Sequence, residues 1–260
     1  MATDHKVEQI EKPSLLWLLT EGGRAIFEYS TFWPYNFFKK VENTGDGHPV
    51  LVLPGFMATD MSTKPLRRFI DKLGYSSYSW DLGRNYGNEA YLDLLTESVE
   101  ELYNEHNQKV SIIGWSLGGV YARQIAKRSP HMVRQVITLG SPFRGVDLPN
   151  HAHWVYKFIT NGKTTKDVDP MIINDLPNPA PVPTTAIYTK EDGVVPWQAC
   201  MEKQESAIHQ NVQVRGSHFG LGVNPTVLEI IADRLVYAEH NWEPFIPSNK
   251  MEEFLFYPSI

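Results

Sequence analysis

The residues best suited to chemistry in this sequence are a serine, an aspartate and a histidine that follow separate predicted strands. Ser116 lies in Gly114-Trp115-Ser116-Leu117-Gly118, a G-x-S-x-G pattern typical of a sharp strand-to-helix turn that exposes a nucleophile. A serine hydroxyl is a weak nucleophile that needs a base, and the base needs an orienting acid. The pattern therefore predicts a nucleophilic serine, provided that both partners occur in the chain.

Asp192 and His218 are the expected partners of Ser116. In this kind of site the chain order is serine, then acid, then histidine. Asp192 follows the predicted strand 183–190, and His218 follows the last predicted strand, 211–216. We expect Asp192 to hold the imidazole of His218 in the tautomer that takes the serine proton and later returns it to the leaving group.

Other acids and histidines remain candidates for these two roles. An aspartate before a glycine is also a common turn residue, so Asp192 has a purely structural interpretation. Asp169 and Asp175 lie in an irregular stretch, Glu191 adjoins Asp192, and Asp81 precedes the serine and so breaks the expected order. The chain has nine histidines, and the alternatives considered for the base are His151, His153, His209 and His240.

Backbone donors and aromatic side chains complete the expected site. The N–H of Leu117, which follows the nucleophile, is one expected donor to an oxyanion. The second is the N–H of Phe56, in a loop where Gly55 allows close approach, although Pro54-Gly55 is also compatible with a simple turn. The side chains expected to shape the substrate pocket are those of Trp115, Phe143, Trp197 and Phe219.

Strands and helices are expected to alternate from residue 48 onward, which predicts an α/β fold with a mostly parallel sheet covered on both faces. Sites in such sheets form at the carboxyl ends of the strands, where the polar residues above occur. The expected strands are 49–56, 75–82, 110–116, 133–142, 183–190 and 211–216. The expected helices are 62–74, 88–107, 117–129 and 225–240.

The length of 260 residues fits a single domain, 1–260, with three additions to the alternating core. Residues 1–47 form an aromatic-rich helical extension, 143–183 a lid-like or cap insertion, and 241–260 a C-terminal tail. The aromatic stretch Trp17–Phe38 is interpreted as a helix packed on the core, with an acyl-pocket cover, a dimer contact or a membrane-surface contact as the alternatives.

Composition excludes several function classes. The formal net charge of −6 argues against a general attraction to nucleic acid. The single cysteine, Cys200, cannot form an internal disulfide, and we expect no metal site and no cofactor. The apolar stretch Leu15–Leu19 is too short to span a bilayer, so we expect no stable membrane insertion and a cytoplasmic location.

With these residues in view, the chain resembles the α/β-hydrolase superfamily and is similar to its bacterial serine esterase and triacylglycerol-lipase branch. The resemblance runs from about residue 48 to 237. It rests on the motifs Pro54-Gly55-Phe56, Gly114-Trp115-Ser116-Leu117-Gly118, Gly140-Ser141-Pro142-Phe143-Arg144-Gly145, Asp192-Gly193-Val194-Val195-Pro196 and Gly216-Ser217-His218. Two departures from typical lipases are Phe143, where histidine is usual, and Pro54, where histidine often precedes the glycine.

The resemblance implies a serine carboxylester hydrolase that acts on small to medium acyl esters through a covalent acyl-enzyme. Two alternatives remain open. An alcohol acceptor could take the acyl group in place of water, which would make the protein an acyltransferase. Some members of the fold bind small molecules without catalysis. The aromatic N-terminal segment and the tail are also candidate contacts of a homodimer.

Overall fold

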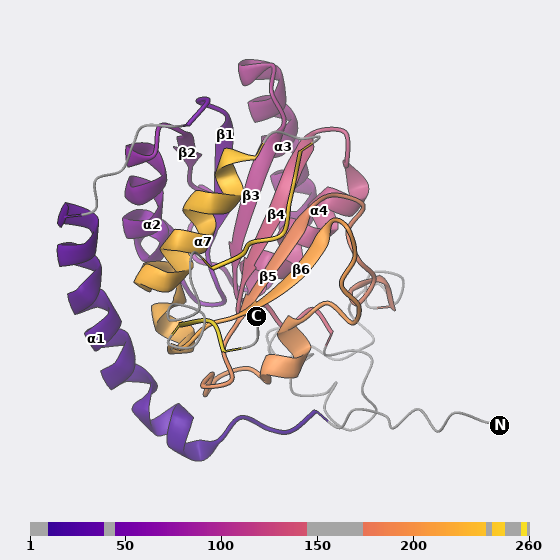
Figure 1. The fold of residues 1–260 in the computed structure, drawn as a ribbon. Coiled ribbons are helices and arrows are strands. Elements are labelled where there is room, and N and C mark those ends of the chain that lie inside the picture. Colours follow the sequence, from indigo (N-terminus) through magenta and orange to yellow (C-terminus); the bar gives the residue numbers. More distant parts are fainter. Residues whose placement is uncertain (1–9, 39–44, 145–173, 238–240, 248–255, 259–260) are drawn as a thin grey trace.

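The structure is a computed structural model that describes residues 10–38, 45–144, 174–237, 241–247 and 256–258. Its centre is a sheet of six parallel strands (Figure 1). In chain order these are β1 (Pro49–Leu53), β2 (Ser76–Tyr78), β3 (Val110–Trp115), β4 (Val133–Leu139), β5 (Thr184–Tyr188) and β6 (His209–Gln213). Their order across the sheet is β2-β1-β3-β4-β5-β6. Because all the strands run the same way, their carboxyl ends meet at one edge.

Helices cover both faces of this sheet, as the alternating pattern predicted. The helices are α1 (Leu15–Phe38), α2 (Asp60–Lys72), α3 (Tyr91–His106), α4 (Leu117–Arg128) and α7 (Pro225–Val236), with the short 3₁₀ helices η1 (Trp197–Cys200) and η2 (His218–Val223). Figure 1 shows α7 crossing in front of the strands. Successive strand residues point to opposite faces, so each strand contributes to two separate cores.

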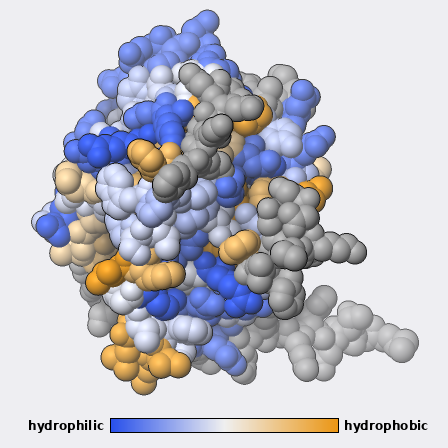
Figure 2. Space-filling view, turned by 60° about the vertical axis from the view of Figure 1, so that its left-hand side comes forward, coloured by the Kyte–Doolittle hydropathy of each residue, from blue (hydrophilic) through white to orange (hydrophobic). Residues whose placement is uncertain are grey.

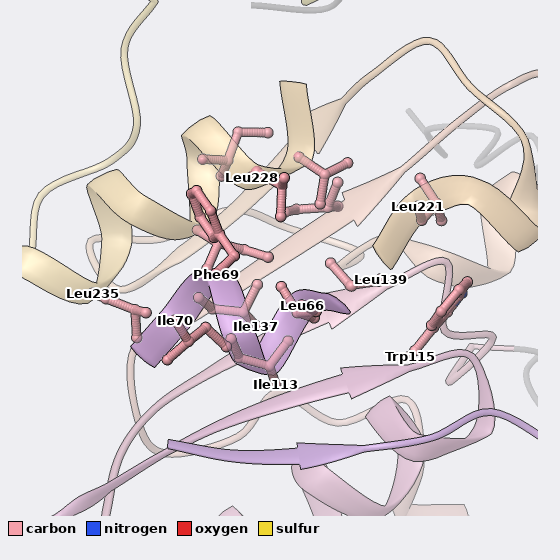
Figure 3. Packing of buried hydrophobic residues seen from close by; sticks show 14 of the residues in the cluster. Leu66, Phe69, Ile70, Ile113, Trp115, Ile137, Leu139, Leu221, Leu228 and Leu235 are labelled. Carbon is pink, nitrogen blue, oxygen red and sulfur yellow. The ribbon is translucent and has the colours of Figure 1, made fainter. Parts of the chain in front are cut away.

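The first core lies between the sheet and α2, α7 and part of α1. Figure 3 shows how Leu66, Phe69 and Ile70 of α2 lie among strand side chains and the leucines of α7. Ile113 of β3 belongs to this core, whereas its neighbour Ile112 belongs to the second core, beneath α3 and α4. β3 is therefore fully buried and, apart from Ser111, apolar, as a central parallel strand requires.

A side-chain cap marks the start of α7, whereas α2 begins earlier than the sequence signals predicted. α7 begins where Asn224 accepts a hydrogen bond from the Thr226 N–H at 2.9 Å, with Pro225 in the first turn. α2 begins at Asp60 rather than at residue 62, because its N-cap is Thr59 and not Ser62 or Thr63. The starts of α2 and α7 set the lengths of the connections that follow β1 and β6.

The long N-terminal helix α1 lies against the side of the molecule that carries α2 and α7. Phe32 enters the first core, which agrees with the interpretation of this stretch as a core-packed helix. Its outer face is nevertheless rich in exposed apolar side chains, and Figure 2, which brings the α1 side of Figure 1 forward, shows orange patches among blue ones. The exposed apolar residues of α1 are Leu15, Leu16, Leu18, Leu19, Ile26, Phe27, Trp33 and Phe37. Among the described helices, none has the length and apolarity needed to cross a membrane.

The structure describes the expected insertion and tail only in part. Residues 145–173 of the insertion lie outside the described residues, and so do Asp169, His151 and His153. The end of the insertion is ordered against the second core through buried Leu176, Ala180 and Val182. In the tail, Phe245 and Tyr257 are buried in the first core, so these two residues pack on their own chain.

Candidate active site

The turn that carries Ser116 is as sharp as the sequence motif requires. Ser116 has φ 52° and ψ −120°, a backbone conformation that is rare for residues other than glycine. Its N–H donates to the Leu139 carbonyl at 2.8 Å, which ties the turn to the neighbouring strand. A side chain at Gly114 would place its Cβ 2.3 Å from Gly119 Cα, and one at Gly118 would come 2.4 Å from the Leu53 oxygen. Larger residues at either position would disrupt the turn.

Three side chains from distant parts of the sequence meet at the carboxyl edge of the sheet. The Ser116 Oγ lies 3.1 Å from His218 Nε2, and His218 Nδ1 lies 2.6 Å from Asp192 Oδ2. The other oxygen of Asp192 accepts hydrogen bonds from the N–H groups of Val194 and Val195, each at 2.7 Å. Asp192 is thus held by its own loop and can orient the imidazole, while the imidazole faces the serine hydroxyl.

The electrostatics of His218 suit a base that becomes charged during a reaction. Burial lowers the pKa of this imidazole, but the negative charge of Asp192, its hydrogen bond and the charge of Glu21 together raise that pKa above the ordinary value. The surroundings therefore stabilise the imidazolium. A base that takes a proton from serine must pass through that form.

The loop after β1 lies directly beside the serine. A Cβ at Gly55 would stand 3.2 Å from Ser116 Cβ, so only a glycine fits this approach comfortably. Fully buried Asn85 holds the loop, because its side-chain N–H donates to the Pro54 carbonyl at 2.9 Å and its backbone carbonyl accepts from the Met57 N–H at 2.7 Å. Phe56 lines the cavity at Ser116, and Leu117 begins α4 directly after the serine. The sequence reasoning missed Asn85, which carries no motif of its own.

A cavity of about 560 Å³ opens at Ser116 and His218. Trp115 and Phe219 line it, as expected, and the Trp115 indole N–H also donates to the His218 carbonyl at 3.0 Å. Most of the remaining lining is apolar, and α1 contributes to it. The other lining residues are Ala25, Ile26, Tyr29, Gly55, Phe56, Met57, Ala58, Ser62 and Val194.

Phe143 and Trp197 lie elsewhere, which corrects the expectation for these two side chains. Phe143 is fully buried in the second core, where the Arg123 guanidinium carbon lies 3.7 Å from its ring centroid. Trp197 stacks on Tyr188, with ring centroids 5.8 Å apart. Both adjoin site motifs in the sequence, but nearness along the chain does not decide the direction in which a side chain points.

The competing acids are engaged elsewhere. Asp175 pairs with Lys127 at 2.9 Å, and Asp81 accepts the Ser79 hydroxyl at 2.8 Å. Glu191 accepts the Gly216 N–H at 3.1 Å and so connects the acid loop to the histidine loop. Among the described candidates, Asp192 alone has a carboxylate in hydrogen-bonding contact with His218.

A second Ser-His-Asp arrangement occurs near the opposite edge of the sheet. His48 Nδ1 lies 2.5 Å from Asp46 Oδ1, and His48 Nε2 lies 2.8 Å from Ser111 Oγ. Ser111 is fully buried inside β3, and it does not line the cavity at Ser116. The arrangement fits a satisfied polar cluster in the core, because a substrate cannot reach an enclosed hydroxyl. Sequence reasoning did not foresee it.

His209 is also engaged in structural contacts. One of its ring nitrogens lies 2.7 Å from the Ala180 carbonyl and the other 2.8 Å from the Ser206 hydroxyl.

Within the residues that the structure describes, His, Cys, Asp and Glu side chains do not gather in groups of three that could hold a metal ion.

Comparison with known proteins places the chain in a family. A family model described as palmitoyl protein thioesterase matches residues 49–179, half of the chain. The chain belongs to the palmitoyl protein thioesterase family. The matched range contains Ser116 and the loop after β1, while Asp192 and His218 follow it. The expectation of an α/β-hydrolase is thereby confirmed, and this family member is an esterase-, lipase- and thioesterase-like α/β-hydrolase.

Curated relatives of this palmitoyl protein thioesterase family member match it over part of their length. Pimeloyl-[acyl-carrier protein] methyl ester esterase of Shewanella woodyi is 29% identical over 102 residues, which cover 39% of each chain. A probable alcohol acetyltransferase of Cyberlindnera fabianii is 26% identical over 121 residues, 44% of this chain and 32% of the relative. The chain thus spans about a third to two fifths of the length of these relatives.

Solved structures support the fold of this family member. Aspergillus fumigatus lipase B superposes with a TM-score of 0.61 at 16% identity, over 79% of this chain and 56% of the lipase. Paleococcus ferrophilus monoacylglycerol lipase superposes with a TM-score of 0.52 at 13% identity, over 72% of this chain and 93% of that chain. At such identities the likeness concerns the fold alone.

Proposed function

We propose that the chain is a serine acyl hydrolase, which cleaves oxygen esters or thioesters of apolar acyl groups through a covalent ester on Ser116. The observation that carries this proposal is the 3.1 Å contact between Ser116 Oγ and His218 Nε2 at the base of an apolar cavity. Membership of the palmitoyl protein thioesterase family and the esterase relative support the same class of bond.

The first half of the proposed reaction forms the acyl-enzyme. The Ser116 oxygen bonds to the acyl carbon while its proton passes to His218 Nε2, and Asp192 stabilises the resulting imidazolium. The N–H groups of Phe56 and Leu117 stabilise the negative oxygen of the tetrahedral intermediate. When the intermediate collapses, the bond to the alcohol or thiol breaks, and His218 gives that leaving group its proton.

The second half releases the acid. A water molecule gives a proton to His218 as its oxygen bonds to the acyl carbon. Collapse of this second intermediate breaks the bond to Ser116, and the proton returns to the serine oxygen. Neither half needs a group beyond the triad and the two backbone donors.

The cavity favours apolar acyl chains of small to medium size. Its volume of about 560 Å³ lies in the range of small-molecule sites, and α1 supplies Ala25, Ile26 and Tyr29 to its wall. Burial of the chain against these side chains would stabilise the bound substrate by about 0.8 kcal/mol per methylene.

The proposed function is tested with a fluorophosphonate probe and graded p-nitrophenyl esters and acyl thioesters. We expect one probe adduct, located at Ser116 by peptide mass spectrometry, and turnover of esters or thioesters. A purified, folded protein that takes up no probe and cleaves no substrate of the series would contradict the proposal and favour a non-catalytic, ligand-binding role.

Acyl transfer to an alcohol is the second candidate function. The observation that favours it is the relative described as a probable alcohol acetyltransferase, together with a cavity whose lining would admit an alcohol. Product analysis with a vinyl ester and a primary alcohol separates the two functions. A new ester that grows with alcohol concentration supports transfer, whereas free acid as the sole product supports hydrolysis.

We expect a charge in the cavity wall to penalise long acyl chains. Ile26 is 72% exposed and lines the cavity, so Ile26→Asp can be made with little effect on the core. Desolvation of the new carboxylate by an acyl chain would cost roughly 1.4 kcal/mol or more, which is a tenfold rise in KM. KM for octanoyl and acetyl p-nitrophenyl esters measures this: the octanoyl value should rise and the acetyl value should change little.

Leu19→Asp is the matched control for this substitution. It introduces the same charge on the same helix, at a residue that is 83% exposed and lies outside the lining of the cavity. KM for both esters should stay near the wild-type value. An equal rise in octanoyl KM for both variants would show that the added charge on α1, and not its place in the cavity wall, determines the preference for acyl-chain length.

A further inference from the structure

The helix α1 presents three charged side chains to the two loops that carry Asp192 and His218. They are Glu21, Arg24 and Glu28, whose spacing of three and four residues places them on one side of a helix. Glu21 and Glu28 are buried even though the helix carries many exposed apolar residues. Charged groups are rarely buried without a partner, so the contacts of this face explain its position.

Glu21 joins the two loops through a single carboxylate. Its Oε1 accepts hydrogen bonds from the N–H groups of Gly193, at 2.9 Å, and of His218, at 3.2 Å. Its Oε2 accepts from the Phe219 N–H at 3.3 Å. Gly193 follows the acid of the triad, and His218 is the base itself. Only 2% of Glu21 is exposed, so water competes little for these contacts.

Arg24 and Glu28 extend the same connection. Arg24 donates to the carbonyls of Glu191 and Gly216, each at 3.0 Å, and pairs with Glu21 at 2.9 Å. Glu28 accepts from the Ser217 N–H at 3.1 Å and from the Ser217 hydroxyl. The residues that flank Asp192 and His218 are therefore held from α1.

The helix and the acid loop are in direct backbone contact. A Cβ added at Gly193 would lie 2.3 Å from the Leu18 N and would collide with the helix. The acid loop therefore packs directly on the backbone of α1 at a point where only a glycine fits, and this contact together with the hydrogen bonds keeps the Glu21 carboxylate within reach of both loops.

We infer that Glu21 is a positioning residue, which sets the distance between Asp192 and His218 by holding both loops on α1. This inference rests on the proposed function, because the distance between Asp192 and His218 matters only if the two residues act in catalysis. On this inference the face of α1 that carries Glu21 supports the catalytic pair from outside the alternating core. A misplacement of about 1 Å between catalytic groups can reduce turnover by about a hundredfold.

Glu21 also acts on His218 through its charge. The negative charge of Glu21 is one of the causes that raise the pKa of His218. Since only neutral imidazole can accept the serine proton, kcat/KM should fall as the pH drops through that pKa. Other titratable or charged groups around this part of the site are Asp192, Glu191, Arg24, Glu28 and Tyr29. Arg215 pairs with Glu191 at 3.7 Å, and the Cys200 thiol lies close enough to Asp192 to be influenced by its charge.

The test compares Glu21→Gln with the wild type. Glutamine has nearly the same shape but no charge, so it weakens the hold on both loops and removes a charge that favours the imidazolium. We expect kcat to fall by about 10- to 100-fold with little change in KM. We also expect the acid limb of the kcat/KM profile to move to lower pH. A side chain with a purely structural role would not move that limb.

Two further variants make the result specific. Glu21→Asp keeps the charge but shortens the reach, so its kcat should fall while its acid limb stays closer to that of the wild type. Glu229→Gln is the matched control, because Glu229 accepts the Tyr35 hydroxyl at 2.6 Å and joins α1 to α7 away from the triad. Its kcat and pH profile should remain those of the wild type.

The outcomes separate this inference from the proposed function. Wild-type protein that labels at Ser116, with Glu21→Gln retaining both kcat and acid limb, would overturn the role of Glu21 and leave the proposed function standing. Wild-type protein without labelling or turnover would overturn both. If Glu21→Gln yields little folded protein, the Glu21→Asp profile decides: wild-type kcat in that variant would overturn the inference.

Discussion

Replacement of Ser116 by alanine is expected to reduce turnover of activated esters by about 10⁴- to 10⁶-fold. The substitution removes the oxygen that lies 3.1 Å from His218 Nε2, so no acyl-enzyme can form. The remaining rate would come from the oxyanion donors and from substrate binding. Initial rates with a p-nitrophenyl ester at saturating concentration measure the loss, and a fluorophosphonate adduct should disappear in parallel.

The chain offers an unusually close control in Ser111→Ala. Ser111 has the same side chain and the same kind of His-Asp partners as Ser116, but it is fully buried in β3. We expect esterase activity near the wild-type value and a loss of about 1–3 kcal/mol in the free energy of unfolding, since the ring of His48 loses a buried partner. Activity that survives in Ser116→Ala would refute the assignment of the nucleophile.

Asp192→Asn is expected to lower kcat by about 10⁴-fold. An amide is uncharged, so it no longer stabilises the imidazolium, and its NH₂ group can face His218 Nδ1 and favour the wrong tautomer. The two N–H groups of Val194 and Val195 would still hold the amide oxygen, so the loop should keep its position. Steady-state kinetics measure the loss, and circular dichroism with thermal unfolding checks that the fold persists.

Asp175→Asn separates the loss of the triad acid from the loss of any buried carboxylate. Asp175 was an alternative acid on the sequence alone, yet its carboxylate pairs with Lys127. Its replacement should weaken that contact and leave kcat near the wild-type value. A larger loss for Asp175→Asn than for Asp192→Asn would mean that the acid had been assigned to the wrong residue.

Much of the sheet and the order of the site could be predicted from the sequence because both depend on local signals. β3 is a buried segment that is apolar apart from Ser111, and side chains at Gly114 or Gly118 would collide with neighbouring backbone. Strand, turn and helix can therefore be predicted from this one stretch of sequence. The expected order of serine, acid and histidine along the chain then pointed to Asp192 and His218, and the observed contact between these two side chains agrees with that choice.

The remaining parts depend on long-range packing that leaves no local pattern. Phe143 and Trp197 adjoin site motifs in the sequence, but their rings pack on Arg123 and Tyr188. The role proposed for Glu21 requires the position of a helix more than 170 residues away from its partners along the chain. A weak signal was present, since Glu21, Arg24 and Glu28 are the charged residues of a helix that is otherwise uncharged, and their spacing places them on one side. The sequence alone did not show which groups these charged residues contact, because that depends on the packing of both loops against α1.

The backbone at Ser116 carries a cost that the rest of the molecule must offset. A serine held at φ 52° is disfavoured by about 1–3 kcal/mol relative to a relaxed residue. The central position of β3 and the bond from Ser116 N–H to Leu139 keep it there. A lineage that no longer needed the hydroxyl would gain stability from a glycine at this one position, so durability and reactivity compete for the same residue.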